Sequence, residues 1–475
     1  MRKIPRDPLI VGAFSILLVV LTLPAVSNSP YQYDEADYMY AARLGWKANY
    51  TDQPTLPIAE FFRAGRSHRS DDNQKLELSE QIRGANDVLF YRHWHGPLYF
   101  YWLIATSHFG LDEFGVRLAT LAFPIFSLMV IYFGALWLFP GMTGIIAAVL
   151  SSVLFLCSLP VVRSMELAPH QAFACCSLGA LFLLAKSTAS GERRYFCMAV
   201  IAAALACCLL EVGFVLVATV LACCYFDRHN LRADWTLAWR SLLLFVGAVI
   251  VVWPAAILKL SLLKSYAFMA YLSLFRKSPW GSIGLLETWR QRFFASPVEW
   301  ILIAAGLLIL IFSRKLGVDR RVLCAFTVYA CLMIAATLRV TSATPRYALV
   351  FQPVLDVLAG CVLAVLIARW RPIAACLATA SISLMLLGET WLNVHRQQPA
   401  ADPRPAALLA YIRQNHLEHS RLMVPQTDIP VLHYYFPNAQ LKGYYGLEPI
   451  STSTSDKDGI VYPDFPIRYR PPRQM

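Results

Sequence analysis

The fold of this chain is decided by a polar stretch that opens with YDEADY, residues 33–38, and closes with RHWHGPLY, residues 92–99. Carboxylates cluster at its start, and a basic, aromatic turn ends it. Long apolar runs fill most of the remaining chain. In a mostly hydrophobic chain, a polar loop with carboxylates beside the membrane is the first place to expect chemistry.

The composition is that of a multispan membrane protein. The chain has 475 residues, of which 57% are hydrophobic and 15% are charged, and its mean hydropathy is +0.50. This is too apolar for a soluble protein of the same length. The net charge of +12 lies in short clusters between apolar runs, which excludes nucleic acid as the partner and favours membrane lipids. The 12 cysteines all fall in apolar segments and read as small buried residues, not as disulfides or zinc ligands.

Hydropathy and loop charge predict eleven membrane spans. The first, Pro8–Val26, has the length that a bilayer core requires and follows a basic start, which places that start in the cytoplasm. Gly96–Gly110 is too short to cross and suits an interfacial helix, and helical spacing predicts another over Tyr33–Trp46. The other predicted spans are Phe114–Phe139, Met142–Leu159, Ala168–Lys186, Tyr195–Leu210, Gly213–Phe226, Ser241–Leu260, Trp300–Ser313, Val322–Leu338, Tyr347–Ala368 and Pro372–Trp391.

The chain is expected to have two domains. Residues 1–391 form the transmembrane domain, whose first outer loop is the polar stretch 31–99, and residues 392–475 form a small extracytoplasmic domain. The pattern in this tail predicts a helix through Tyr411 and Ile412 and a strand at Arg421–Val424, so we expect it to be an α/β unit.

The order of motifs resembles a known class. An Asp-Glu pair just after the first span, then a His-x-Pro-Leu-Tyr turn entering an apolar aromatic helix, resembles the GT-C glycosyltransferases that use polyprenyl-phosphate sugars. Within that class it is similar to the protein O-mannosyltransferases and the aminoarabinose transferase of lipid A. The segments Glu113–Leu121, Arg163–Glu166 and Pro345–Tyr347 match further family motifs. The resemblance covers Leu9 to about Leu387 and implies an all-α polytopic core of the GT-C type.

The resemblance implies catalytic roles for the first acidic pair. Transfer of a sugar to a hydroxyl needs a base that takes the acceptor proton, and by resemblance Asp34 is that base, with Glu35 supporting it. In the family either acid of the pair can take the leading role, so the resemblance leaves Glu35 open as the base. The residues alone leave a second interpretation open, because acids at a helix start also complement the helix dipole.

The histidines of the closing turn leave the question of a metal open. His95 stands where the family has a His or Lys before Pro-Leu-Tyr, which implies a phosphate or acceptor contact, although Gly96 replaces the commoner proline. His93 and His95 with Asp34 could instead bind a divalent metal. They could equally be part of an interfacial aromatic belt.

Three arginines are the expected contacts of the donor phosphate. Arg117, expected to face the outer headgroups, Arg163 and Arg346 all lie at outer helix ends, where a charge is costly unless a lipid phosphate uses it. Simple snorkelling of their side chains to the headgroups is the alternative. Tyr347 adjoins Arg346, and Glu166 adjoins the Arg163 corner.

Glu211 departs from the family pattern. It stands at an outer turn where many relatives carry Thr-Lys, which suggests a different sugar or a salt bridge to a neighbouring arginine.

The resulting functional hypothesis is an inverting membrane glycosyltransferase. It takes a sugar from an undecaprenyl-type polyprenyl phosphate and transfers it to an acceptor at the outer face. The residues leave the class of acceptor open among lipid, glycan and protein. The chain length favours a bacterial inner-membrane enzyme over the eukaryotic protein mannosyltransferases. A transporter or lipid-carrier flippase is the first alternative; it would place ionisable groups within spans, and Asp356 is the clearest such group. A non-catalytic relative that only binds the lipid carrier is the second.

Overall fold

The structure is a computed structural model that describes residues 7–43, 95–231, 234–254, 285–312, 320–338, 344–396, 404–419, 421–425, 428–444 and 460–461. Contacts divide the chain into two units. Unit 1 comprises Met1–Ser27, Arg117–Val252 and Ala270–Pro399, and unit 2 comprises Asn28–Val116, Trp253–Met269 and Ala400–Met475.

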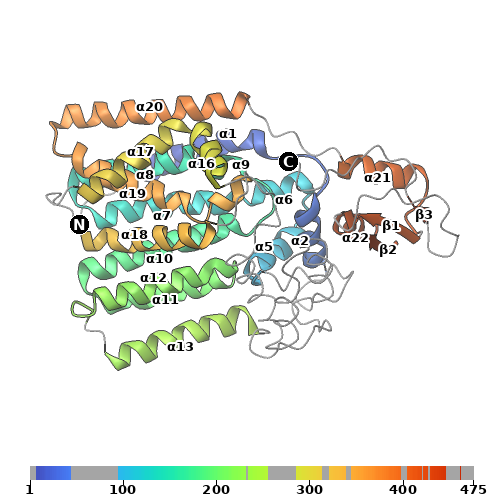
Figure 1. Ribbon diagram of the computed structural model, residues 1–475, viewed down its shortest axis with the longest axis horizontal. Helices are drawn as coiled ribbons and strands as arrows, with labels where there is room; N and C mark the ends of the chain where they lie inside the picture. Colours follow the sequence, from blue (N-terminus) through green and yellow to red (C-terminus); the bar gives the residue numbers. More distant parts are fainter. Residues whose placement is uncertain are drawn as a thin grey trace. The chain divides into compact units, whose positions relative to one another are not determined.

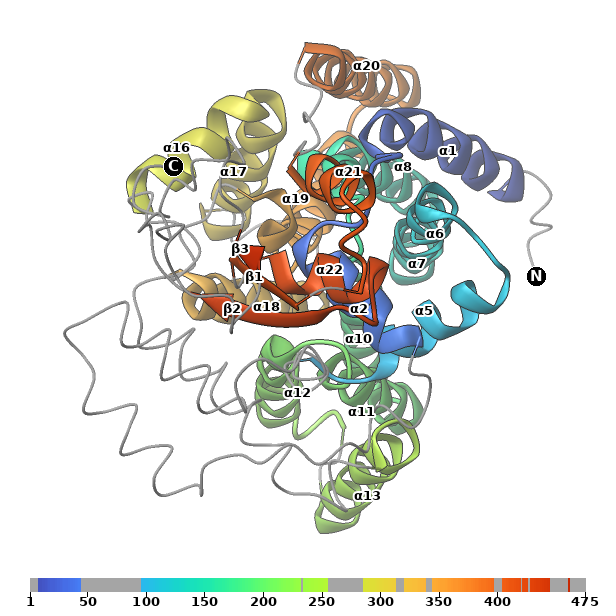
Figure 2. The same ribbon diagram turned by 90° about the vertical axis from the view of Figure 1, so that its right-hand side faces the viewer.

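Unit 1 is helical throughout its described part, and its long helices lie side by side with similar directions (Figures 1 and 2). Helices suit apolar runs of this kind because each backbone polar group is satisfied within the segment. The elements are α1 (Asp7–Thr22), η1 (Leu23–Ala25), α7 (Ala122–Leu138), α8 (Gly141–Cys157), α9 (Leu159–Arg163), α10 (His170–Ser190), α11 (Arg193–Cys207), η4 (Glu211–Gly213), α12 (Phe214–Phe226), α13 (Trp235–Val252), α16 (Leu285–Ala295), α17 (Pro297–Phe312), α18 (Arg320–Thr337), η5 (Pro345–Ala348), α19 (Gln352–Ile367) and α20 (Pro372–Arg396).

The core of unit 1 is built around α19, which packs against α8 and α17. Fifteen of its residues are buried, so it is the helix most enclosed by others. Gly360 makes the contact with α8 close, because an added Cβ would lie 2.6 Å from the backbone nitrogen of Ser151. Such small residues let helix backbones approach, which is the usual way that membrane helices pack.

Unit 2 combines helices with a small sheet. Its helices are α2 (Tyr33–Arg43), α5 (Leu98–His108), α21 (Arg404–Gln414) and α22 (Ile429–Tyr435), and α6 (Glu113–Ala119) begins in this unit. The sheet contains β1 (Arg421–Pro425), β2 (Gln440–Tyr444) and β3 (Ile460–Val461) in the parallel order β2-β1-β3. The helix through Tyr411 and the strand from Arg421 that the sequence predicts are both present. The proposed domain boundary at residue 391 stays a prediction.

Every predicted span overlaps a helix or helix pair of the described residues. The agreement is poorest for Ser241–Leu260, because α13 begins six residues earlier and the last six residues of that span lie outside the described part of the chain. Among the described residues, five helices are long and apolar enough to cross a membrane, or six if the bent pair α16 and α17 is one span. Four more helices are apolar but shorter, so the count of eleven spans stays a prediction. The segment expected to be too short to cross forms α5, an 11-residue helix.

Candidate active site

The acidic helix α2 of unit 2 carries the predicted base. Asp34 and Glu35 lie in its first turn, where negative charge is stabilised by the helix dipole. Asp34 is partly exposed, whereas Glu35 is only 6% exposed. The Glu35 carboxylate accepts a hydrogen bond from the backbone N–H of Gln32 at 3.1 Å. Glu35 therefore stabilises the start of the helix, and Asp34 is the more exposed of the two acids.

The backbone at the start of α2 is strained. Tyr33 has φ = 32°, a conformation that is costly for a residue with a bulky side chain. Strained residues cluster at functional sites, where the surrounding structure holds them. This strain lies immediately before Asp34.

Burial on α2 differs from the single apolar stripe predicted for an interfacial helix. Seven of its eleven residues are buried, among them Asp37, which is 0% exposed. Helices α5 and α22 of the same unit pack against α2 and cover it. Asp37 is a third carboxylate, one turn after Asp34, and the spacing of three residues was the signal in the sequence that could have found it.

His95 lies against α2, and its predicted contact with a phosphate or acceptor stays a prediction. Its ring centroid is 6.0 Å from that of Tyr38, which also contacts the rings of Tyr99 and Phe100 on α5. The predicted partner His93 lies outside the described residues. Within the described part of the chain, no group of three or more His, Cys, Asp or Glu side chains could hold a metal ion.

The C-terminal part of unit 2 fastens the start of α2. The Tyr435 hydroxyl accepts a hydrogen bond from the backbone N–H of Tyr31 and donates one to Glu113, both at 2.8 Å. Burial raises the pKa of this hydroxyl, so it keeps the proton that it donates. At the other end of α2, Arg43 donates to the backbone carbonyl of Tyr434 and stacks on its ring. Sequence patterns gave no sign of these contacts.

A second group of predicted residues meets in unit 1. Arg346 on η5 forms an ion pair with Glu166, with Nε 3.6 Å from Oε1. Its guanidinium also stacks on the ring of Tyr347 and donates to that hydroxyl at 3.3 Å. The ring of Tyr347 also contacts the ring of His170, and the two ring centroids are 5.7 Å apart. The structure thus joins Arg346, Tyr347 and Glu166, and adds a histidine that the sequence did not point to.

Arg163 lies on α9, which packs against η5. It donates a hydrogen bond to the backbone carbonyl of Asn393 at 2.8 Å. Burial lowers the pKa of this guanidinium, because removing the charge from water is unfavourable. A partly buried cation of this kind forms its strongest hydrogen bonds with an anion such as a phosphate.

Arg117 and Glu211 occupy other positions in unit 1. We expected Arg117 to face the headgroups, but it is 2% exposed and donates to the backbone carbonyl of Ser27 at 2.9 Å. The main-chain carbonyl of Ser27 offers the guanidinium an acceptor, which explains why the side chain turns inward. Glu211 is also buried, at the first position of η4 between α11 and α12.

Further carboxyl groups that the sequence did not place in a site gather at the start of α17. Glu389 accepts hydrogen bonds from the backbone N–H groups of Val298 and Glu299, at 3.0 and 3.4 Å. Glu299 in turn accepts one from the Gln352 amide at 2.6 Å. Asp356, one turn further along α19, is completely buried. This cluster ties α17, α19 and α20 together beside the element that carries Arg163.

Comparison with known proteins identifies the fold. No protein-family model matches the sequence, and no curated protein matches it significantly. Among solved structures, ArnT from Cupriavidus metallidurans bound to undecaprenyl phosphate superimposes with a TM-score of 0.56 at 15% identity, over 90% of this chain and 84% of that one. The oligosaccharyltransferase AglB from Archaeoglobus fulgidus, in complex with an inhibitory peptide and a dolichol-phosphate, gives 0.59 at 13% identity, over 92% and 64%. The chain has the GT-C fold. This confirms the fold class that the order of motifs suggested, and it makes the chain a helical membrane protein.

Proposed function

We propose that this GT-C protein is a membrane glycosyltransferase that takes a sugar from a polyprenyl-phosphate donor. The observation that carries the proposal is the shared fold with two proteins solved in complex with a polyprenyl phosphate. The positions of the acids on α2 and of the arginines on α9 and η5 support it. Fold alone does not determine function, so the argument rests on what these side chains can do.

The proposed reaction is a single displacement that inverts the sugar carbon. The acceptor hydroxyl oxygen forms a bond to that carbon while the bond to the phosphate oxygen breaks. Asp34 takes the acceptor proton, a role that suits a carboxylate exposed enough to meet a second substrate. The leaving group is the polyprenyl phosphate, whose negative charge increases as it departs.

The arginine group of unit 1 is the proposed phosphate site. Arg346 is positioned by stacking on Tyr347, and its ion-pair partner Glu166 is partly exposed. The contact with that carboxylate is long, at 3.6 Å, and a donor phosphate can replace it with shorter, bidentate hydrogen bonds. Arg163 adds a second, partly buried cation on the adjoining element. Preorganised positive charge of this kind stabilises the departing phosphate more than it stabilises the intact donor.

We also propose the finer topology. The chain crosses a bacterial inner membrane eleven times, with α5 interfacial, and its acidic helix and its small C-terminal α/β part face outward. Single cysteines at Asn73 and Ser455, in a cysteine-free background, should react in intact cells with an impermeant thiol reagent. A cysteine at the exposed Ser190 should react only after lysis, and labelling of that position from outside would contradict this topology.

The catalytic assignment is tested with Asp34→Asn, which keeps the size of the side chain but cannot take a proton. We expect the turnover number to fall about 10²–10⁴-fold, the usual contribution of a general base, with little change in donor binding. Product formation from a panel of purified polyprenyl-phosphate sugars would measure it.

Asp112→Asn is the matched control. Asp112 is exposed and accepts a hydrogen bond from the backbone N–H of Gly115 at 2.7 Å, a role that the asparagine oxygen can keep. Parental turnover in Asp34→Asn would remove this residue from the mechanism. No turnover of any sugar by the parent, with polyprenyl phosphate still bound, would favour the flippase or the non-catalytic carrier-binding alternative.

A further inference from the structure

The end of unit 1 at the C-terminus of α10 carries a cation on an aromatic platform. The Lys186 ammonium lies 4.9 Å from the centroid of the Trp137 ring and 3.4 Å from the Trp137 carbonyl oxygen. The Trp137 ring meets the ring of Tyr195 edge-on, with centroids 4.9 Å apart. These residues come from α10, α7 and α11, so three helix ends build one feature.

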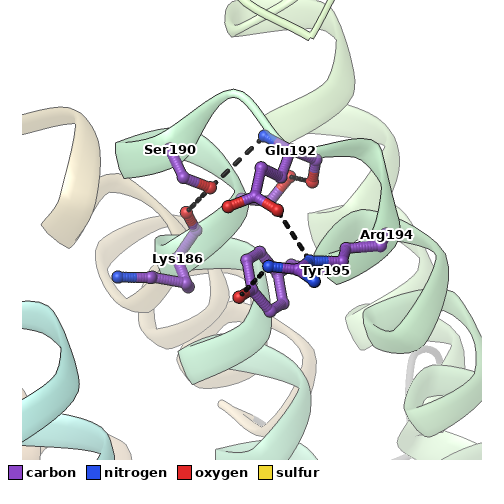
Figure 3. A network of polar contacts seen from close by, with 6 residues as sticks. Lys186, Ser190, Glu192, Arg194 and Tyr195 are labelled. Carbon is purple, nitrogen blue, oxygen red and sulfur yellow. Dashed lines mark hydrogen bonds and ion pairs between the residues drawn. The ribbon is translucent and has the colours of Figure 1, made fainter. Parts of the chain in front are cut away.

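The charges around this platform leave Lys186 available to an anion. Figure 3 shows Glu192 directed toward Arg194, with which it forms an ion pair at 2.6 Å, and the Lys186 side chain pointing another way. Arg194 also donates to the Tyr195 hydroxyl at 2.9 Å. Within the described residues, no carboxylate lies within ion-pair distance of the partly exposed Lys186.

An apolar strip on α10 leads to Lys186. Between residues 170 and 188 the partly exposed residues of α10 are Cys175, Cys176, Gly179, Leu183 and Lys186, which lie along one face of the helix. A Cβ added at Gly179 would have nothing within 4 Å, so the strip is open there. Ten residues of helix are about 15 Å long, which is about the depth of one leaflet of the hydrocarbon core.

Large apolar side chains extend along the neighbouring helix α7 in the same direction. Phe126, Met129, Phe133 and Trp137 are all exposed and recur at helical spacing. The exposed side chains of α7 and the open strip of α10 together form an apolar surface that an acyl chain can contact. Both the row on α7 and the strip on α10 end at Trp137 and Lys186. A tryptophan and a tyrosine at that end suit the level of the lipid headgroups.

We propose that this surface binds one anionic glycerophospholipid, with its phosphate at Lys186 and an acyl chain along the strip of α10. The ammonium supplies the charge complement, and the Trp137 ring holds it in place by a cation–π contact. The length of the strip fits one leaflet, and the positive-inside rule assigns this end to the cytoplasmic one. The inference does not depend on the proposed transferase activity.

The test uses the full-length protein in detergent and native mass spectrometry. Phosphatidylglycerol and phosphatidylcholine with identical acyl chains are titrated, and we expect tighter retention of phosphatidylglycerol. Lys186→Gln should weaken that retention about fivefold, the effect of one lysine near an anionic surface. Gly179→Leu should abolish it, because the new side chain occupies the open strip, where an added Cβ would have nothing within 4 Å.

Two matched variants separate a built site from general attraction. Gly247→Leu on α13 fills an equally open position on another helix, and Arg240→Gln removes an exposed cation; both should retain the lipid as the parent does. Equal retention of the two lipids, or equal loss in Arg240→Gln, would overturn the proposal. So would a change of oligomeric mass in Gly179→Leu with unchanged lipid retention, which would make the strip a contact between copies.

Discussion

The two ends of α10 carry similar residue types in different environments. At the N-terminal end, His170 contacts Tyr347, on which the Arg346 side chain stacks while remaining only 17% exposed. At the C-terminal end, Arg194 stacks on Tyr195 but is 67% exposed. A surface ion pair contributes little, whereas a buried cation is costly unless an anion meets it. This difference supports the proposals that the first end binds a donor phosphate and that the second meets the membrane surface.

The largest expected effect at these ends is on donor affinity. Arg346→Ala should weaken binding of polyprenyl phosphate by about 1.5–3 kcal/mol, the range for a hydrogen bond to a charged group. Binding to the purified protein would be measured by titration. Arg194→Ala removes a stacked, ion-paired arginine at the other end and should leave donor affinity unchanged. An equal loss of donor affinity in Arg346→Ala and Arg194→Ala would contradict the proposal that only the N-terminal end of α10 binds the donor.

A smaller effect on stability should distinguish positions along α10 itself. Gly191 ends the helix with φ = 70°, and an added Cβ would lie 3.1 Å from the Asn230 side-chain oxygen. Gly191→Ala should therefore destabilise the protein by about 1–2 kcal/mol and lower its thermal midpoint in detergent. Gly179→Ala, in the open middle of the helix, should stabilise it by up to about 1 kcal/mol. The reverse order would contradict the backbone geometry at Gly191.

Local patterns in the sequence were enough to predict where most of the apolar helices lie, although α16 and α22 were not predicted. The predicted spans Met142–Leu159 and Val322–Leu338 differ by one or two residues at each end from α8 and α18, because apolar runs and their breakers are local properties. The order of motifs also led to the correct fold class. Helix positions and motifs can both be recognised from short segments of the chain.

The remaining features depend on contacts between distant segments. Burial of Asp37, the inward turn of Arg117 and the placement of His170 beside Tyr347 all arise from neighbours far along the chain. Neither hydrophobic periodicity nor motif spacing shows which distant residues will contact one another. The sequence could therefore name Asp34 and Arg346 by motif, but could not show that Glu35 caps a helix or that Glu166 pairs with Arg346.

The contact between Tyr31 and Tyr435 also sets the order of events during synthesis. The two residues are 404 positions apart, so the acidic helix leaves the ribosome long before the segment that holds it in place. At translation rates of about 5–20 residues per second, roughly 20–80 s separate them. A nascent chain that stops before α22 would have nearly all its apolar helices but an unfastened α2, so assembly of the acidic site is among the last steps in making this protein.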